Sequence, residues 1–256
     1  MTRVVKIGGR AQSSPDLTSR LASAWQAMPG SFCIVHGGGD EISALQQRMG
    51  LKASFVDGRR ITTAEDIAIV RMVLSGLMNK RLVSSLVSAG VPAAGMSGED
   101  AGTISATLID PEHLGRAGRP IAVNTGLIRT LLNAGYLPVI SPLAVEENGQ
   151  AGDALNVNGD DAAAAIAIAL SSSELLIIAD VRGVLNERGQ TIGQLDQNKV
   201  SDLIQAGIVS RGMRAKLEAG FAALTGGVRQ VRISTLDGLE DPKSGTRLTM
   251  TPSLVT

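Results

Sequence analysis

The sequence predicts an α/β fold, a three-layer αβα sandwich in which helices cover both faces of one mainly parallel central sheet. Short apolar segments alternate with segments of helical periodicity along nearly the whole chain, which is typical of parallel sheets with helical crossovers. Glycine clusters directly follow two of the apolar segments. Hydrophobic residues make up 44% of the 256 residues but aromatic residues only 2%, so we expect a core of Val, Ile, Leu and Ala. The length allows one large domain or two small ones, and we expect a single domain, 1–256, whose two lobes meet at serines 171–173.

Each expected strand is a short apolar run, and each expected helix has an apolar stripe. Thr62, with Glu65 three residues later, is the capping box expected to open a long helix that Gly90 ends. Asp57–Gly58 is the expected turn of a hairpin over residues 51–60. In chain order, we expect strands at residues 3–7, 32–35, 92–96, 103–109, 137–141, 175–179, 228–234 and 247–251, and helices beginning at residues 14, 40, 62, 125, 160, 200 and 213.

Composition excludes several classes of protein. The 24 Lys and Arg residues balance the 24 Asp and Glu residues, whereas a nucleic-acid binder needs a basic excess. Cys33 is the only cysteine and there are two histidines, so neither a disulfide nor a zinc cluster is expected. The longest apolar run, residues 162–170, is too short to cross a membrane, and the N-terminus turns polar too early for a signal peptide. We therefore expect a cytoplasmic protein with no nucleic-acid or membrane partner.

Two glycine clusters are candidates for binding an anion. Gly8 and Gly9 follow the first expected strand, residues 37–39 follow the second, and a helix comes after each cluster. Backbone N–H groups at such positions can bind a phosphate, although glycines also serve simply to make tight turns. Lys6 favours the anion, because a lysine in an apolar strand is costly without a partner. The motifs GxxxxGK[ST], GxGxxG and GxSxG are absent, so a P-loop, a dinucleotide fingerprint and a hydrolase elbow are not indicated.

Further polar residues interrupt the apolar pattern, and each also has an ordinary structural explanation. Lys216 opens a helix, where a solvated lysine is common. Residues 156–160, NVNGD, precede the Ala-rich helix and can act as its cap, although three polar side chains exceed what one cap needs. Arg60 follows the hairpin, where it is either a surface residue or a clamp for a carboxylate.

The chain resembles the amino-acid kinase superfamily and, within it, the N-acetylglutamate kinases. The resemblance extends from residue 6 to about residue 246. It is carried by an ordered set of segments: KIGG, VHGGGDE, VDGRRIT, VLSGLMNKRLV, GLIRTLLNAGYLPVISPLAV, NVNGDDAA, ADVRGVL and GMRAKLEA.

The resemblance implies ATP-dependent phosphorylation of the side-chain carboxylate of N-acetyl-L-glutamate, a step of arginine biosynthesis. It implies that Lys6 and Lys216 neutralise charge on the transferred phosphoryl group and that Asp160 orients them. It implies a lobe for the acylated amino acid and for dimerisation over residues 1–172, and a nucleotide lobe over residues 173–256. The cofactors implied are ATP and Mg²⁺, with no direct protein ligand to the metal. The binding residues implied are Gly8, Gly9, Gly38 and Gly39 for phosphate, Arg60, Asn156 and Asn158 for the amino-acid substrate, and Asp180 and Met213 for the nucleotide.

The sequence departs from the family pattern in two places. Gly159 stands in NVNGDD where the family often has Ala. The N-terminus begins almost at the first strand, whereas arginine-inhibited relatives have an additional helix there that joins dimers into hexamers. We therefore expect a homodimer that arginine does not inhibit. The long helix from Thr62 has apolar residues on more than one face, which fits either a helix buried within one subunit or a dimer interface. The resemblance favours the dimer, because the family dimerises through this part of its substrate lobe.

Other functions remain open at this point. Related kinases act on carrier-linked glutamate or aminoadipate, or on N-succinylglutamate, and no motif separates these substrates. An NAD(P)-dependent oxidoreductase would need the dinucleotide fingerprint that this chain lacks. A non-catalytic nucleotide-binding regulator on the same fold would be expected to have lost Lys6, Asp160 or Lys216.

Overall fold

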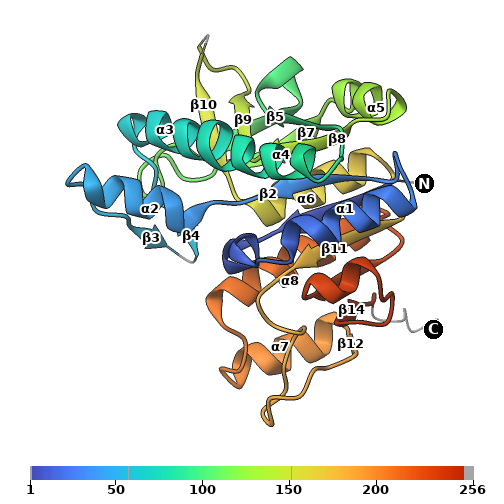
Figure 1. The fold of residues 1–256 in the computed structure, drawn as a ribbon. Coiled ribbons are helices and arrows are strands. Elements are labelled where there is room, and N and C mark those ends of the chain that lie inside the picture. Colours follow the sequence, from blue (N-terminus) through green and yellow to red (C-terminus); the bar gives the residue numbers. More distant parts are fainter. Residues whose placement is uncertain (1, 57, 151, 251–256) are drawn as a thin grey trace.

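An eight-stranded sheet forms the centre of the computed structural model, which describes residues 2–56, 58–150 and 152–250 (Figure 1). Its strands lie in the order β12-β14-β13-β11-β1-β2-β8-β5, and neighbours are parallel except for β13 and β14. The strands are β1 (Arg3–Ile7), β2 (Phe32–His36), β5 (Ala93–Ser97), β8 (Leu137–Ser141), β11 (Glu174–Ile178), β12 (Gln194–Leu195), β13 (Val231–Ser234) and β14 (Thr246–Leu248).

Helices cover both faces of this sheet. The helices are α1 (Leu17–Ala27), α2 (Gly39–Arg48), α3 (Ala64–Arg71), α4 (Asn79–Ser88), α5 (Gly126–Asn133), α6 (Gly159–Ala169), α7 (Gln197–Gln205) and α8 (Arg211–Thr225). Helices α4, α1 and the short 3₁₀ helix η4 (Leu236–Leu239) pack together on one face, while α5, α6 and α8 contact the strands from the other (Figure 1). The predicted αβα sandwich on a mainly parallel sheet is therefore confirmed. Within the described residues, no helix has the length and apolar character needed to cross a bilayer.

A small closed barrel, which the sequence did not reveal, lies beside the main sheet. It consists of β6 (Ile104–Leu108), β7 (Ala117–Val123), β9 (Leu143–Glu146) and β10 (Ala154–Val157), of which only β6 had been expected. The expected hairpin is present as β3 (Phe55–Val56) and β4 (Arg59–Arg60), although Asp57 of its turn lies outside the described residues.

The long helix differs from the expectation at its start and in its middle. The capping box is formed by Thr63 and Asp66, one position after the predicted pair Thr62 and Glu65. The reason is that the backbone of Thr62 pairs with residues 114 and 116, which delays the start of the helix. Between α3 and α4 the chain forms a π-helical segment, η2 (Met72–Met78). The predicted strand at 247–251 is instead β14, Thr246–Leu248, and Thr251 lies outside the described residues.

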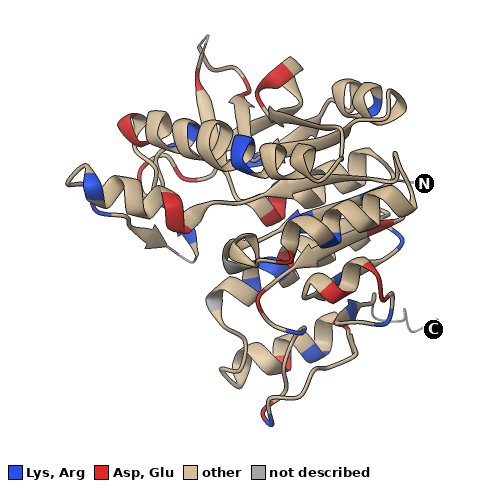
Figure 2. Ribbon diagram, viewed as in Figure 1, with Lys and Arg blue, Asp and Glu red and all other residues tan. Residues whose placement is uncertain are grey.

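The core is aliphatic, as expected, and β1 lies at its centre. Val4, Val5 and Ile7 have no solvent exposure, and the edge of Trp25 packs on Phe32 with the ring centres 5.6 Å apart. Lys6 is the exception within β1, since a charged side chain there is only 5% exposed. Acidic and basic residues are interspersed over both halves of the ribbon (Figure 2).

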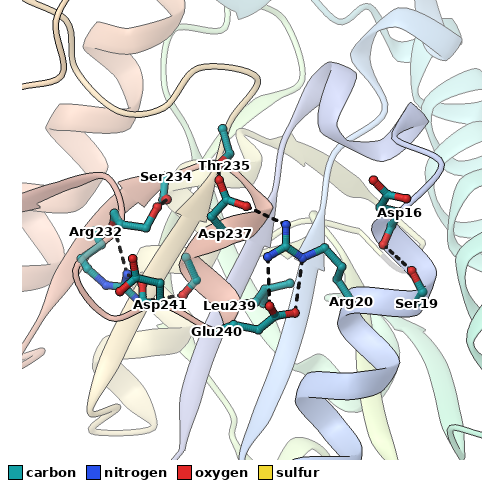
Figure 3. Close-up of polar contacts among 12 residues, drawn as sticks. Asp16, Ser19, Arg20, Arg232, Ser234, Thr235, Asp237, Leu239, Glu240 and Asp241 are labelled. Atoms are coloured by element: carbon teal, nitrogen blue, oxygen red, sulfur yellow. Dashed lines mark hydrogen bonds and ion pairs between the residues drawn. The ribbon is translucent and has the colours of Figure 1, made fainter.

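Two arginines attach the 3₁₀ helix η4 to the rest of the fold (Figure 3). Arg20 of α1 donates to Asp237 at 2.7 Å and to Glu240 at 3.1 Å. Buried Arg232 of β13 donates to the carbonyl oxygens of Gly238 and Asp241 at 2.8 and 2.9 Å. These contacts connect residues 237–241 to β13 and to the first helix.

Candidate active site

The carboxylate of Asp160 holds two lysines that come from opposite ends of the sequence. Lys6 projects from β1, Asp160 stands in the first turn of α6, and Lys216 projects from α8. Lys6 Nζ lies 2.8 Å from Asp160 Oδ1, and Lys216 Nζ donates to Asp160 Oδ2 at 3.1 Å. The structure therefore brings together the three residues for which the sequence predicts a catalytic role.

Burial and charge act together on this cluster. The pKa of Lys6 is lowered, mainly by burial. The negative charge of Asp160 opposes this shift, and the positive charge of Lys216 adds to it. Burial alone would raise the pKa of Asp160, but Lys6 and Lys216 hold it below its usual value, so the carboxylate stays ionised at neutral pH. Two ammonium groups against one carboxylate leave an excess of positive charge, which suits a polyanionic ligand such as a phosphate chain.

The two glycine clusters surround these lysines. A Cβ on Gly8 would lie 2.8 Å from Lys6 Nζ and 3.7 Å from Lys216 Nζ, so the missing side chain makes room for both ammonium groups. The N–H of Gly8 donates to Ile178 O at 3.2 Å, so Gly8 does not present the phosphate donor predicted for it. Gly38 and Gly39 begin α2 and line a cavity, and exposed Gly9 begins the short helix that follows β1.

A first cavity, of about 150 Å³, lies on one side of the lysine cluster. Asn156 Nδ2 donates to Thr62 Oγ1 at 2.9 Å, while Asn158 Oδ1 accepts from Asp160 N at 2.8 Å and so caps α6. Capping, the ordinary structural explanation, therefore accounts for one oxygen of Asn158. The residues of this cavity that the sequence had singled out are Gly38, Gly39, Arg60, Asn156, Asn158 and Gly159.

Arg60 is held firmly where it lines the first cavity. Its Nη1 donates to Gln46 Oε1 at 2.6 Å, and its Nη2 donates to Gly39 O at 2.7 Å and to Ser43 Oγ at 2.8 Å. Its guanidinium also stacks on Phe55, with Cζ 4.7 Å from the ring centre. Three of the five N–H donors are thus used, and Nε–H and one Nη1–H have no partner among the described residues.

A second cavity, of about 360 Å³, lies on the other side of the cluster. Its wall is formed by the segment after β11 and by the start of α8, and it includes Asp180, Met213 and Lys216. Lys216 therefore faces one cavity while Gly159, directly before Asp160, faces the other. The cluster lies at the junction of two spaces, an arrangement suited to transferring a group between two bound molecules.

The structure also reveals polar residues that sequence reasoning missed. His36, with no solvent exposure, has Nδ1 2.8 Å from Gly37 O and Nε2 3.1 Å from Asn79 Nδ2. Since a carbonyl oxygen only accepts, the hydrogen lies on Nδ1 and the neutral ring accepts from Asn79. His36 thereby fixes the glycine turn that enters α2. Its position between an apolar strand and three glycines was the available signal.

Known proteins resemble this chain in sequence and in fold. The model of the amino acid kinase family matches residues 1–234. The acetylglutamate kinase of Chloroflexus aggregans is 41% identical over 247 residues, which cover 95% of this chain and 95% of that protein. The acetylglutamate kinase of Roseobacter denitrificans is 39% identical over 240 residues, which cover 93% of this chain and 82% of that protein. The crystal structure of smu.665 from Streptococcus mutans has a TM-score of 0.85 at 28% identity, covering 97% of this chain and 98% of that one.

Because His36 is buried, we predict that the folded protein loses stability in mild acid. Burial lowers its pKa to about 4, the hydrogen bond to Gly37 O opposes the shift, and Lys80 and Lys6 add to it. Between about pH 6.5 and 4 the unfolded chain binds a proton at His36 that the folded chain refuses. The free energy of unfolding therefore falls as the pH falls, by at most about 3 kcal/mol from this group.

Urea unfolding between pH 7.5 and 4 measures this effect. His36→Gln should flatten the pH dependence, and His113→Gln, which changes an exposed histidine, should keep it. Equal pH dependence in His36→Gln and the unmodified protein would contradict the prediction.

Proposed function

Because this chain belongs to the amino acid kinase family, we propose that it transfers the γ-phosphoryl group of ATP to the side-chain carboxylate of N-acetyl-L-glutamate. The product is an acyl phosphate, as required for arginine biosynthesis. Two relatives named acetylglutamate kinase, both near 40% identical over more than nine-tenths of this chain, support the proposal. The observation that carries it is the pair of lysines on one buried aspartate between two cavities.

In the proposed reaction, a carboxylate oxygen of the acylated glutamate forms a bond to the γ-phosphorus. The bond from that phosphorus to the β–γ bridging oxygen breaks, and ADP leaves with the electron pair. No general base is required, because a glutamate side chain ionises near pH ~4.3. Catalysis then consists of positioning and of charge neutralisation, which the ammonium groups of Lys6 and Lys216 supply, while Asp160 orients both.

The two cavities receive different substrates in this proposal. We assign the acylated amino acid to the first cavity, in the lobe of residues 1–172, and the nucleotide to the second, in the lobe of residues 173–256. The phosphate chain would lie against the backbone of the two glycine clusters. The residues assigned are Arg60, Asn156 and Asn158 for the amino acid, Gly9, Gly38 and Gly39 for phosphate, and Asp180 and Met213 for the nucleotide.

Mg²⁺ would reach the site bound to the phosphates of ATP and would neutralise part of their charge. The described residues contain no group of three or more His, Cys, Asp or Glu side chains that could hold a metal. Both carboxylate oxygens of Asp160 already face lysines. We therefore assign the ligands of Mg²⁺ to the nucleotide and to water. We also assign the reaction to the cytoplasm, where ATP is available.

Other carboxylate acceptors are the alternative substrates. N-succinylglutamate and carrier-linked glutamate or aminoadipate offer the same reacting group. The relatives named acetylglutamate kinase favour the acetyl group. A hydroxamate assay, which traps the acyl phosphate, should give its highest rate with N-acetyl-L-glutamate in a panel of these compounds. Free glutamate is the control, and a panel that yields no hydroxamate at all would overturn the proposed function.

The proposed roles predict that Lys216→Ala lowers kcat by at least ~10²-fold, because its charge acts mainly in the transition state. The fold should persist, because Asp160 keeps Lys6 as a partner. Steady-state kinetics and circular dichroism measure the two effects. Lys199→Ala, which removes an exposed lysine from α7, is the matched control. A folded Lys216→Ala variant with an unchanged kcat would show that Lys216 is not catalytic.

We also propose that two copies of this chain pair through η2 and its neighbouring helices. Val73 and Leu74 of η2 are buried against the same subunit, yet Met72 is 55% and Leu77 47% exposed. A surface helix usually buries its apolar residues along a single stripe, so a second apolar side favours a partner.

Light scattering should give a mass near twice the 26.4 kDa of one chain. Leu77→Glu should shift the protein toward the monomer, because a charge would have to be buried in the interface. Gln205→Glu adds the same charge at an exposed position of α7 and should leave the mass unchanged. A monomeric mass for the unmodified protein would refute pairing.

A further inference from the structure

A chain of hydrogen bonds connects Arg60 of the first cavity to the start of a helix. Arg60 Nη1 donates to Gln46 Oε1 at 2.6 Å, and Gln46 Nε2 donates to Asp66 Oδ1 at 2.6 Å. The other oxygen, Asp66 Oδ2, accepts from Thr63 N at 3.0 Å within the capping box of α3. Arg60, Gln46 and Asp66 are all buried, at 7%, 1% and 8% exposure. Three elements, β4, α2 and α3, thus meet through one glutamine.

The chemistry of its two partners fixes the orientation of the Gln46 amide. A guanidinium can only donate hydrogen bonds, so it must meet the amide oxygen. An ionised carboxylate can only accept them, so it must meet the amide NH₂. Rotating the amide by half a turn would place donor against donor and acceptor against acceptor. The Gln46 amide therefore has one acceptable orientation, and its oxygen fixes the position of Arg60 Nη1.

We propose that Gln46 is a positioning residue, which aims the guanidinium of Arg60 at the carboxylate of the amino-acid substrate and separates it from Asp66. This inference rests on the proposed function, in which Arg60 binds that carboxylate. Arg60 uses three donors on Gln46, Gly39 and Ser43, and its unused Nε–H and Nη1–H are the groups left for substrate. Gln46 and Ser43 lie one turn apart on α2, so one face of this helix supplies both side-chain acceptors for Arg60.

The neutrality of Gln46 matters as much as its hydrogen bonds. A direct ion pair between Arg60 and Asp66 would neutralise the charge that attracts a carboxylate. The Gln46 amide is held by its hydrogen bond to Asp66 and in turn holds Arg60, and it adds no negative charge of its own. A purely structural glutamine would require only that α2 and α3 stay packed. The two roles differ in what happens when the amide becomes a carboxylate of the same shape.

Gln46→Glu makes that change, and Gln47→Glu is its matched control, since Gln47 is the next residue of α2 and is exposed. In Gln46→Glu the KM for N-acetyl-L-glutamate should rise at least about tenfold while the KM for ATP stays within about twofold. The new carboxylate neutralises Arg60 and cannot donate to Asp66, and both effects act on the side of the first cavity. Gln47→Glu should change neither constant. Equal constants in the two variants, or a parallel rise of both KM values in Gln46→Glu, would overturn the inference.

A second variant covers the case in which Gln46→Glu does not fold. Gln46→Met keeps the volume of the side chain and removes both hydrogen bonds. In ¹⁵N-arginine spectra the Arg60 guanidinium, assigned as the signal absent from Arg60→Lys, should give separate Nη1 and Nη2 resonances in the unmodified protein. In Gln46→Met the Nη1 resonance should shift and broaden, because Nη1 loses its acceptor while Nη2 keeps Gly39 and Ser43. Unchanged resonances in Gln46→Met would overturn the inference.

These readouts separate the two proposals. If the unmodified protein phosphorylates none of the acylated acceptors, the proposed function fails, and the spectra still decide whether Gln46 holds Arg60. If it phosphorylates N-acetyl-L-glutamate but Gln46→Glu leaves its KM unchanged, the inference about Gln46 fails and the function stands.

Discussion

One buried carboxylate determines how this molecule can work. Asp160 faces two lysines, and each of them would be costly to bury alone. Lys6 can occupy the central strand only because Asp160 pairs with it, and Asp160 can be buried only because two cations surround it. The cluster also requires that β1, the first turn of α6 and α8 meet at one point. The two cavities follow from that meeting, since each opens on one side of it.

Arg60 is a second buried charge that the surrounding residues stabilise, but its partners are neutral. It is buried and charged, yet no carboxylate pairs with it directly among the described residues. Neutral acceptors on Gln46, Ser43 and the backbone of Gly39 satisfy three of its donors, and the ring of Phe55 covers its face. Its charge is therefore stabilised without being cancelled. The cluster at Asp160 keeps excess positive charge for phosphate, and this second site keeps it for a carboxylate, which matches a reaction between two anions.

The sequence predicted those parts of the structure that leave a local signal. Seven strands of the main sheet were visible as apolar runs, and Lys6 stood out because it interrupts one. The edge strand β12, which has two residues, was missed. The barrel strands β9 and β10 were missed because they have only four residues each, and β7 because Arg119 and Pro120 interrupt its apolar run. All three are stabilised by pairing between distant segments. The capping box was misplaced by one residue because Thr62 pairs with a distant loop. The contacts of Gln46 and Asn79 depend on how helices pack against strands, which periodicity alone does not determine.

The π-helical segment η2 has a consequence for how this chain can change in length. Such segments contain one more residue per turn than the α-helix around them, which makes them equivalent to a one-residue insertion. Deleting one residue within η2 would therefore leave a continuous α-helix in which α3 and α4 keep their orientations. Asn79 would stay beside His36. A deletion in α3 or α4 instead turns the rest of the helix by about 100°, so homologous chains should tolerate a change of length in η2 more readily than elsewhere in this helix.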